Sequence, residues 1–217
     1  MNDAGIRLAA ARPARSAAGD DEGPIPLHRP DLGVAEEAAA ARVLRSGWVS
    51  QGPETEAFER EFAAYVGAPH AVAVSSGTAA LELALAALGI GGGGEVVTVS
   101  HSFVATANAI RNAGASAVFV DIDRATFNLD PALIAAALSP STRAILAVHQ
   151  LGMPCDLGAI VSVARAHGIA LVEDAACATG SAILRQGRWE RIGSTAGCYS
   201  FRRETTGSTR MARKAGR

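Results

Sequence analysis

The 217-residue chain is short of lysine, cysteine and long apolar runs. Only one of its 20 basic residues is a lysine, Lys214, near the C-terminus. The three cysteines, Cys155, Cys177 and Cys198, form no CxxC pair. This number and spacing argue against a disulfide scaffold or a zinc site and favour a reducing compartment, so we expect a cytoplasmic protein. No apolar run reaches the ~20 residues that span a bilayer.

The overall charge and composition are those of an ordinary globular protein. The formal net charge is −1, so the whole-chain balance indicates neither a nucleic-acid partner nor a membrane surface. Hydrophobic residues make up 49% of the chain, which excludes wholesale disorder. We interpret residues 1–24, which lack a continuous apolar core, as a flexible lead-in. Residues 202–217 form a basic tail of low hydrophobicity.

Between these ends, apolar strands alternate with amphipathic helices. The patterns predict helices over 34–45, 53–65, 78–88, 103–113, 131–138 and 157–167, and strands over 71–74, 95–99, 117–120, 144–148 and 169–172. Apolar strands separated by helices indicate an α/β fold, a mostly parallel sheet sandwiched by helices. Ligands of such sheets bind at the carboxyl ends of the strands.

The first polar group at such an end is the sequence Ser75-Ser76-Gly77-Thr78. Here a predicted strand runs into small polar residues and a helix begins. The exposed amides and positive end of that helix suit an anion, best a phosphate. An ordinary N-cap by Ser75 or Ser76 explains the same residues without a ligand, and it is favoured on this segment alone.

Three other strand ends carry candidate site residues. Asp174 follows an apolar strand, and a carboxylate there could hold the protonated ring nitrogen of a pyridine cofactor. A capping or surface aspartate explains it equally well. Phe103 could stack on a flat ring, but by itself it is favoured as a core residue of the following helix. His149 could contact a ligand or be a hydrogen-bonded loop histidine.

Residues 89–94 formally fit the dinucleotide fingerprint G-x-G-x-x-G. That fingerprint must follow a strand and open a helix, whereas this segment follows a predicted helix and enters a predicted strand. We therefore interpret it as a connector and assign it no nucleotide role.

Five segments occur in an order and spacing that are specific together. They are GWVSQGPETEAFEREFAAYVGA (47–68), SSGTAALELAL (75–85), SFVATANAIRNAGASAVFVDID (102–123), HQLGMPCDL (149–157) and VEDAACATG (172–180). In them the chain resembles the DegT/DnrJ/EryC1/StrS family of sugar aminotransferases, which are pyridoxal 5′-phosphate enzymes of fold-type I. The resemblance covers residues 25–201, the large domain of such an enzyme, and implies a C-terminally truncated member whose small domain is missing.

The resemblance implies roles for the matched positions. Gly77 and Thr78 would bind the cofactor phosphate, with Ser200 as a further contact. Phe103 would stack on the pyridine ring and Asp174 would pair with its nitrogen. The family commonly moves an amino group from glutamate to a nucleotide-linked keto-sugar, in nucleotide-sugar and polysaccharide biosynthesis, and acts as a homodimer.

Two positions depart from the family pattern. Cys177 stands where the family has a glutamine near the ring, and Thr205 stands where it has the Schiff-base lysine, counting from Ser200. That amine holds the cofactor and then moves the substrate proton, and threonine can do neither. We therefore assign no catalytic residue and expect little or no turnover. Two alternatives stay open: a non-catalytic protein that binds cofactor or sugar and, less favoured, a relative of the pyridoxal-phosphate sugar dehydratases.

Overall fold

The computed structural model describes residues 32–185, 187–194 and 197–198. Its helices are α1 (Val34–Ser46), α2 (Pro53–Val66), α3 (Gly77–Ala87), α4 (Val104–Asn112), α5 (Pro131–Ala137) and α6 (Leu157–His167), with a short 3-10 turn, η1 (Gln150–Gly152). Its strands are β1 (Glu95–Val99), β2 (Ser116–Val120), β3 (Thr142–Val148), β4 (Ala170–Asp174), β5 (Ala182–Arg185), β6 (Arg188–Arg191) and β7 (Gly197–Cys198).

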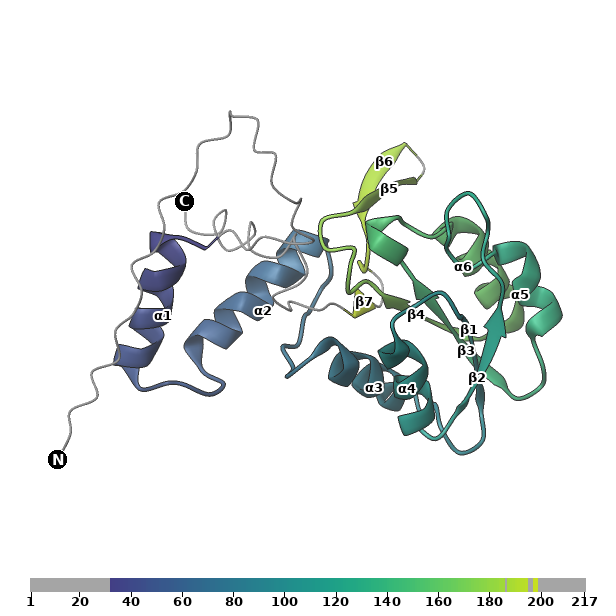
Figure 1. Cartoon of the computed structure of the whole chain (residues 1–217), viewed down its shortest axis with the longest axis horizontal. Coiled ribbons are helices and arrows are strands. Elements are labelled where there is room, and N and C mark those ends of the chain that lie inside the picture. Colours follow the sequence, from purple (N-terminus) through teal and green to yellow (C-terminus); the bar gives the residue numbers. More distant parts are fainter. Residues whose placement is uncertain (1–31, 186, 195–196, 199–217) are drawn as a thin grey trace, which may run out of the picture.

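Five of these strands form one sheet in the order β2-β1-β3-β4-β7, and every neighbouring pair is parallel. In Figure 1, α3 and α4 lie on one face of the sheet, and α5 and α6 lie on the other. The central strands β1 and β3 are buried almost throughout, as apolar strands covered on both faces must be. The predicted α/β fold with a parallel sheet is confirmed.

Local sequence signals set the ends of the helices. The carboxylate of Asp156 caps α6 by accepting a hydrogen bond from the Ala159 N–H over 3.0 Å. The same helix ends at Gly168, whose φ of 64° is a left-handed conformation that favours glycine. Pro131 occupies the first turn of α5, where its missing N–H costs no helical hydrogen bond.

The order of the strands places a switch point between β1 and β3. From β1 the chain passes through α4 to β2 on one side, and β3 then lies on the other side of β1. The segments that follow β1 and β3 therefore leave the sheet toward opposite faces, because α4 and α6 cover different faces. Such a point opens a crevice at the carboxyl ends of the strands, where ligands of open α/β sheets bind.

One predicted strand is wrong. Residues 71–74 form no strand, and Val72 is exposed. The N–H of Ala73, which a sheet would need as a donor, donates instead to the Glu59 carboxylate of α2 over 2.7 Å. The antiparallel hairpin of β5 and β6 was not predicted, since its residues do not alternate cleanly between apolar and polar.

Helices α1 and α2 lie to one side of the sheet, beyond β7 in Figure 1. Phe62 of α2 is buried, and its ring stacks on that of Phe58 at 5.7 Å between ring centroids. Tyr65 anchors the helix to β6: the Arg191 guanidinium lies 3.9 Å from its ring centroid and donates to its hydroxyl over 3.0 Å.

Candidate functional site

The N-terminus of α3 lines a cleft beside the sheet. Ser76 is the N-cap, and its hydroxyl accepts a hydrogen bond from the Ala79 N–H over 3.1 Å, so the predicted cap is confirmed. The cap leaves the N–H groups of Gly77 and Thr78 without a hydrogen-bond partner among the described residues. Gly77 lies on the wall of a cleft of about 430 Å³ that Cys198 of β7 also lines. Amides of this kind are suited to an anion.

Asp174 ends β4 beside that cleft. Its backbone pairs in register with that of Cys198 in β7, and Cys198 is one of the residues that line the cleft. The side chain is buried, and both oxygens accept hydrogen bonds: Oδ2 from the Thr106 hydroxyl over 2.7 Å and Oδ1 from the Ala176 N–H over 3.2 Å. Gly77 lines the same cleft as Cys198, the strand partner of Asp174, so Gly77 and Asp174 lie near the same end of the sheet. The structure thus brings these two predicted site residues together.

Phe103 lies just before α4 and is its N-cap residue. It is 68% exposed, so the simpler interpretation of Phe103 as a core residue is wrong. An aromatic ring that presents most of its surface to solvent at the carboxyl edge of the sheet is free to stack on a flat ligand.

The other predicted site residues follow β4 or lie further along the chain. Cys177 is exposed in the turn after β4, where partial burial and the negative charge of Asp174 raise the pKa of its thiol. A raised pKa keeps this thiol protonated and weakly nucleophilic. Ser200 and Thr205 lie outside the described residues.

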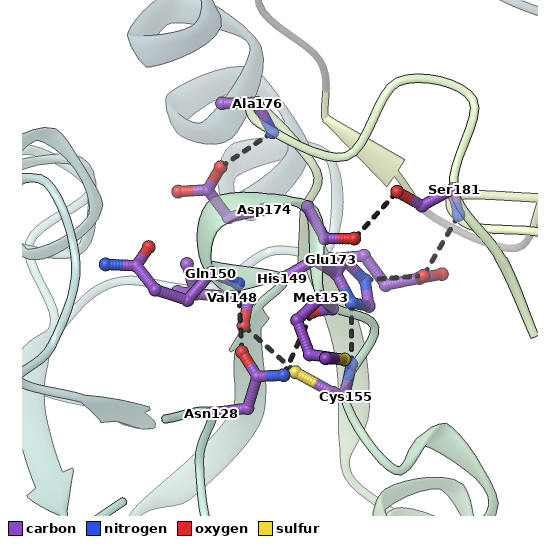
Figure 2. Close-up of polar contacts among 12 residues, drawn as sticks. Asn128, Val148, His149, Gln150, Met153, Cys155, Glu173, Asp174, Ala176 and Ser181 are labelled. Atoms are coloured by element: carbon purple, nitrogen blue, oxygen red, sulfur yellow. Dashed lines mark hydrogen bonds and ion pairs between the residues drawn. The ribbon is translucent and has the colours of Figure 1, made fainter. Parts of the chain in front are cut away.

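A buried hydrogen-bond network lies next to Asp174 (Figure 2). His149, which follows β3, approaches Glu173 of β4 with 3.1 Å between Nε2 and Oε2. The Cys155 N–H donates to Nδ1 of the same ring over 3.0 Å, so the ring proton is on Nε2 and is donated to Glu173. Glu173 Oε2 also accepts from the Gly193 N–H over 3.0 Å. His149 is therefore a hydrogen-bonded loop histidine that ties the ends of β3 and β4 together.

Asn128 links two of the loops at this edge. Its side chain accepts from the Gln150 N–H and donates to the Met153 carbonyl, both over 2.9 Å (Figure 2). These two contacts flank Leu151, whose φ of 50° is a backbone conformation that residues with a side chain rarely adopt. The amide of Asn128 thus holds a strained turn in place beside His149.

Thr106 and Glu173 are two residues of this edge whose contacts were not predicted. Each is a polar residue on a buried part of a regular element, at 1% exposure. A buried polar side chain requires a partner, and that requirement was the available signal in the sequence. The partner could not be named, because it lies far away along the chain.

The chemical groups at this edge of the sheet fit a phosphorylated pyridine. Amides suit a phosphate, a buried carboxylate suits a protonated ring nitrogen, and an exposed aromatic ring suits a flat heterocycle. Within residues 32–185, 187–194 and 197–198, no group of three or more acidic, histidine or cysteine side chains is arranged to hold a metal ion. No helix in the same part of the chain combines the length and apolarity that crossing a membrane demands.

Comparisons with known proteins agree with this chemistry. The spore coat polysaccharide biosynthesis protein SpsC of Bacillus subtilis (strain 168) is 51% identical over 152 residues, which are 70% of this chain and 39% of SpsC. The crystal structure of S. venezuelae DesV in complex with a ketimine intermediate is 43% identical with a TM-score of 0.72, covering 82% of this chain and 51% of DesV. That of B. subtilis NtdA with bound cofactor PMP is 36% identical with a TM-score of 0.65, covering 66% and 33%.

The chain thus spans between a third and about half of the length of these relatives. The profile of one family matches residues 30–206, from just before α1 to beyond β7, and includes every element of the described fold. By that match, the protein belongs to the DegT/DnrJ/EryC1/StrS aminotransferase family.

Proposed function

We propose that this chain binds pyridoxal 5′-phosphate, or its amine form PMP, at the carboxyl edge of the sheet. The observation that carries the proposal is the placement of Asp174. Its carboxylate is buried at the end of β4 and accepts hydrogen bonds from Thr106 and Ala176. Its strand partner, Cys198 of β7, lines the same cleft as Gly77. The family match and the relative NtdA, with its bound PMP, support the same cofactor.

Each part of the cofactor has a residue to hold it. The amides of Gly77 and Thr78 bind the phosphate, with Ser200 as a further contact. The ring of Phe103 stacks on the pyridine, the Asp174 carboxylate bonds its protonated nitrogen, and Cys177 lies near the ring. When bound, the protonated pyridine acts as an electron sink for the substrate carbon that gains or loses a proton.

The reaction class is amino transfer from a donor such as glutamate to a nucleotide-linked keto-sugar. The name of the relative SpsC, a polysaccharide biosynthesis protein, supports a role in making cell-surface sugars. We also propose a cytoplasmic homodimer. With Thr205 at the position of the Schiff-base lysine, the chain has no amine there to hold the cofactor covalently or to move the substrate proton. It is therefore a cofactor and sugar binder with little or no turnover.

The cofactor proposal is tested by titrating the purified chain with pyridoxal phosphate and with PMP, following cofactor fluorescence. Wild type should bind both. Asp174→Asn removes the charge that pairs with the ring nitrogen and should weaken PMP binding at least about tenfold. Asp130→Asn is the matched control, because the same substitution at the N-cap of α5 keeps a capping side chain and should leave binding unchanged. Failure of wild type to bind either form overturns the proposal.

Turnover is tested separately by borohydride reduction of the chain mixed with pyridoxal phosphate. Without an amine at position 205 we expect no cofactor attached to a lysine after reduction, and no amino transfer from glutamate to a nucleotide-linked keto-sugar. A reduced adduct together with amino transfer would show that another amine, such as that of Lys214, serves the reaction.

A further inference from the structure

The hydroxyl groups of Ser102 and Thr106, at the start of α4, form a line of hydrogen bonds that ends on the carboxylate of Asp174. The Thr106 hydroxyl donates to Asp174 Oδ2 over 2.7 Å, although the two residues are 68 positions apart. The Ser102 hydroxyl lies 2.6 Å from the Thr106 hydroxyl. Thr106 is 1% exposed and Asp174 is 7% exposed, so water competes little for these bonds.

The hydrogen bonds of this line run in one direction. An ionised carboxylate only accepts, so the single hydroxyl proton of Thr106 is donated to Asp174. The Thr106 oxygen is then an acceptor toward Ser102, and Ser102 is the donor of the pair. Each bond polarises the next, and the bond that ends on the charge is the strongest of the line.

The same line sets where the start of α4 lies relative to β4. Phe103 stands between Ser102 and the first turn of α4, and the Thr106 N–H donates to the Phe103 carbonyl over 3.0 Å. Anchoring Thr106 to Asp174 therefore also anchors the backbone of Phe103. One hydroxyl thus links the aromatic residue and the carboxylate to which the proposed function assigns the pyridine ring.

We propose that Thr106 is a positioning residue for the cofactor ring: its hydroxyl, backed by that of Ser102, orients the Asp174 carboxylate toward the ring nitrogen and sets its spacing from Phe103. This inference rests on the proposed function, since it needs a pyridine in the site. Thr106 acts through Asp174 and touches neither cofactor nor substrate.

A hydroxyl is required for this role, and packing alone does not supply it. Valine has nearly the shape of threonine and would fill the same buried space, but it cannot donate to Oδ2. Among the described residues, Thr106→Val therefore leaves the Ala176 N–H as the one donor to the Asp174 carboxylate, and it leaves a methyl group facing the Ser102 hydroxyl. Thr106→Ser removes a methyl group but keeps the donor.

The test measures the dissociation constant of PMP and of an analogue with a C–H group in place of the ring nitrogen. We expect Thr106→Val to weaken PMP binding roughly tenfold, since a hydrogen bond to a charged group is lost. Thr106→Ser should stay within about twofold of wild type, and Ser102→Ala should weaken PMP binding about threefold. The analogue has no ring nitrogen that could hydrogen-bond with the Asp174 carboxylate. Its dissociation constant should therefore be the same for wild type and for all the variants.

The outcomes separate this inference from the function on which it rests. If wild type binds neither PMP nor pyridoxal phosphate, the proposed function fails and this inference with it. If wild type binds PMP and Thr106→Val binds it equally well, only the positioning role is overturned. Equal weakening of PMP and the analogue also overturns it, because loss of structure rather than loss of carboxylate orientation would then be the cause. Should Thr106→Val fail to fold, Ser102→Ala and Thr106→Ser decide the question by the same comparison.

Discussion

The carboxylate of Glu173 accepts a hydrogen bond from Nε2 of His149 over 3.1 Å, and both side chains are buried. The Cys155 N–H occupies the other ring nitrogen, so the ring is neutral and its one proton is directed at Glu173. A buried carboxylate of this kind is tolerated only because its donors are in place. Since Glu173 precedes Asp174, this network supports the end of β4 on which the proposed site depends.

Replacing Glu173 with alanine is expected to lower the free energy of unfolding by about 2–4 kcal/mol, because the donors on His149 and Gly193 lose their buried acceptor. Urea denaturation measures the effect. Glu190→Ala is the matched control: its ion pair with Arg185 is partly exposed, so the change should be below about 1 kcal/mol. Equal losses in the two variants would contradict a special role for the buried acceptor.

Replacing Asn128 with alanine is expected to loosen the turn after His149. The Gln150 N–H loses its acceptor, and the strained backbone at Leu151 loses the side chain that bridges its two neighbours. Hydrogen exchange of the Gln150 amide should accelerate roughly tenfold while that of the central strands stays unchanged. Asn108→Ala, on the exposed side of α4, is the control and should leave the Gln150 amide as slow as in wild type.

The three thiols should react at very different rates. Burial, aided by nearby carboxylates, raises the pKa of Cys155 and of Cys198 to about 12. At pH 8 only about one in 10⁴ of these thiols is then ionised, and both residues are buried. The pKa of Cys177 is also raised, but its side chain is exposed.

A thiol-specific chromogenic reagent at pH 8 should therefore modify one thiol of the folded chain, Cys177, and all three in urea. Cys177→Ser should abolish the fast reaction and leave the count in urea at two. Rapid reaction of two or more thiols without denaturant would show that the edge strand β7 or the loop after β3 opens readily.

The acid titration of Asp123 should depend on Thr126. The Thr126 hydroxyl and N–H each donate to Asp123 Oδ1 over 2.9 Å, and they hold the pKa of Asp123 below its ordinary value of 3.8. A lowered folded-state pKa contributes stability that is present above the ordinary value and is lost as the pH falls through the folded value. The contribution therefore disappears only in acid, below about pH 3.8.

Thr126→Val removes the hydroxyl, which has the largest effect, and should move the pKa of Asp123 upward toward its ordinary value. Carboxyl carbon NMR measures this titration directly. Thr126→Ser keeps the donor and should titrate like wild type. A pKa of Asp123 that is unchanged in the valine variant would assign the shift to the backbone N–H groups of Thr126 and Ala125.

Sequence patterns predicted most helices and strands because their signals are local. The helix over 157–167 and the strand over 95–99 are found with the same bounds, since apolar periodicity and end signals lie within the segments themselves. The strand predicted over 169–172 continues to Asp174, because its polar last two residues are paired and buried in the fold. The strand predicted over 71–74 is absent, because the Ala73 N–H donates to the Glu59 carboxylate of α2.

The chain alone specified its family and its parallel α/β plan, because its motifs and alternating apolar segments are local signals. The turn near Gly77 was expected to meet Asp174 through a strand over 71–74, which is absent; the tertiary structure instead makes Gly77 line the same cleft as Cys198, the strand partner of Asp174. Tertiary structure decided which donors hold those groups. Thr106 reaches Asp174 across 68 residues and His149 reaches Glu173 across 24. Periodicity and capping act over a few residues, whereas the partner of a buried polar group depends on how distant elements pack.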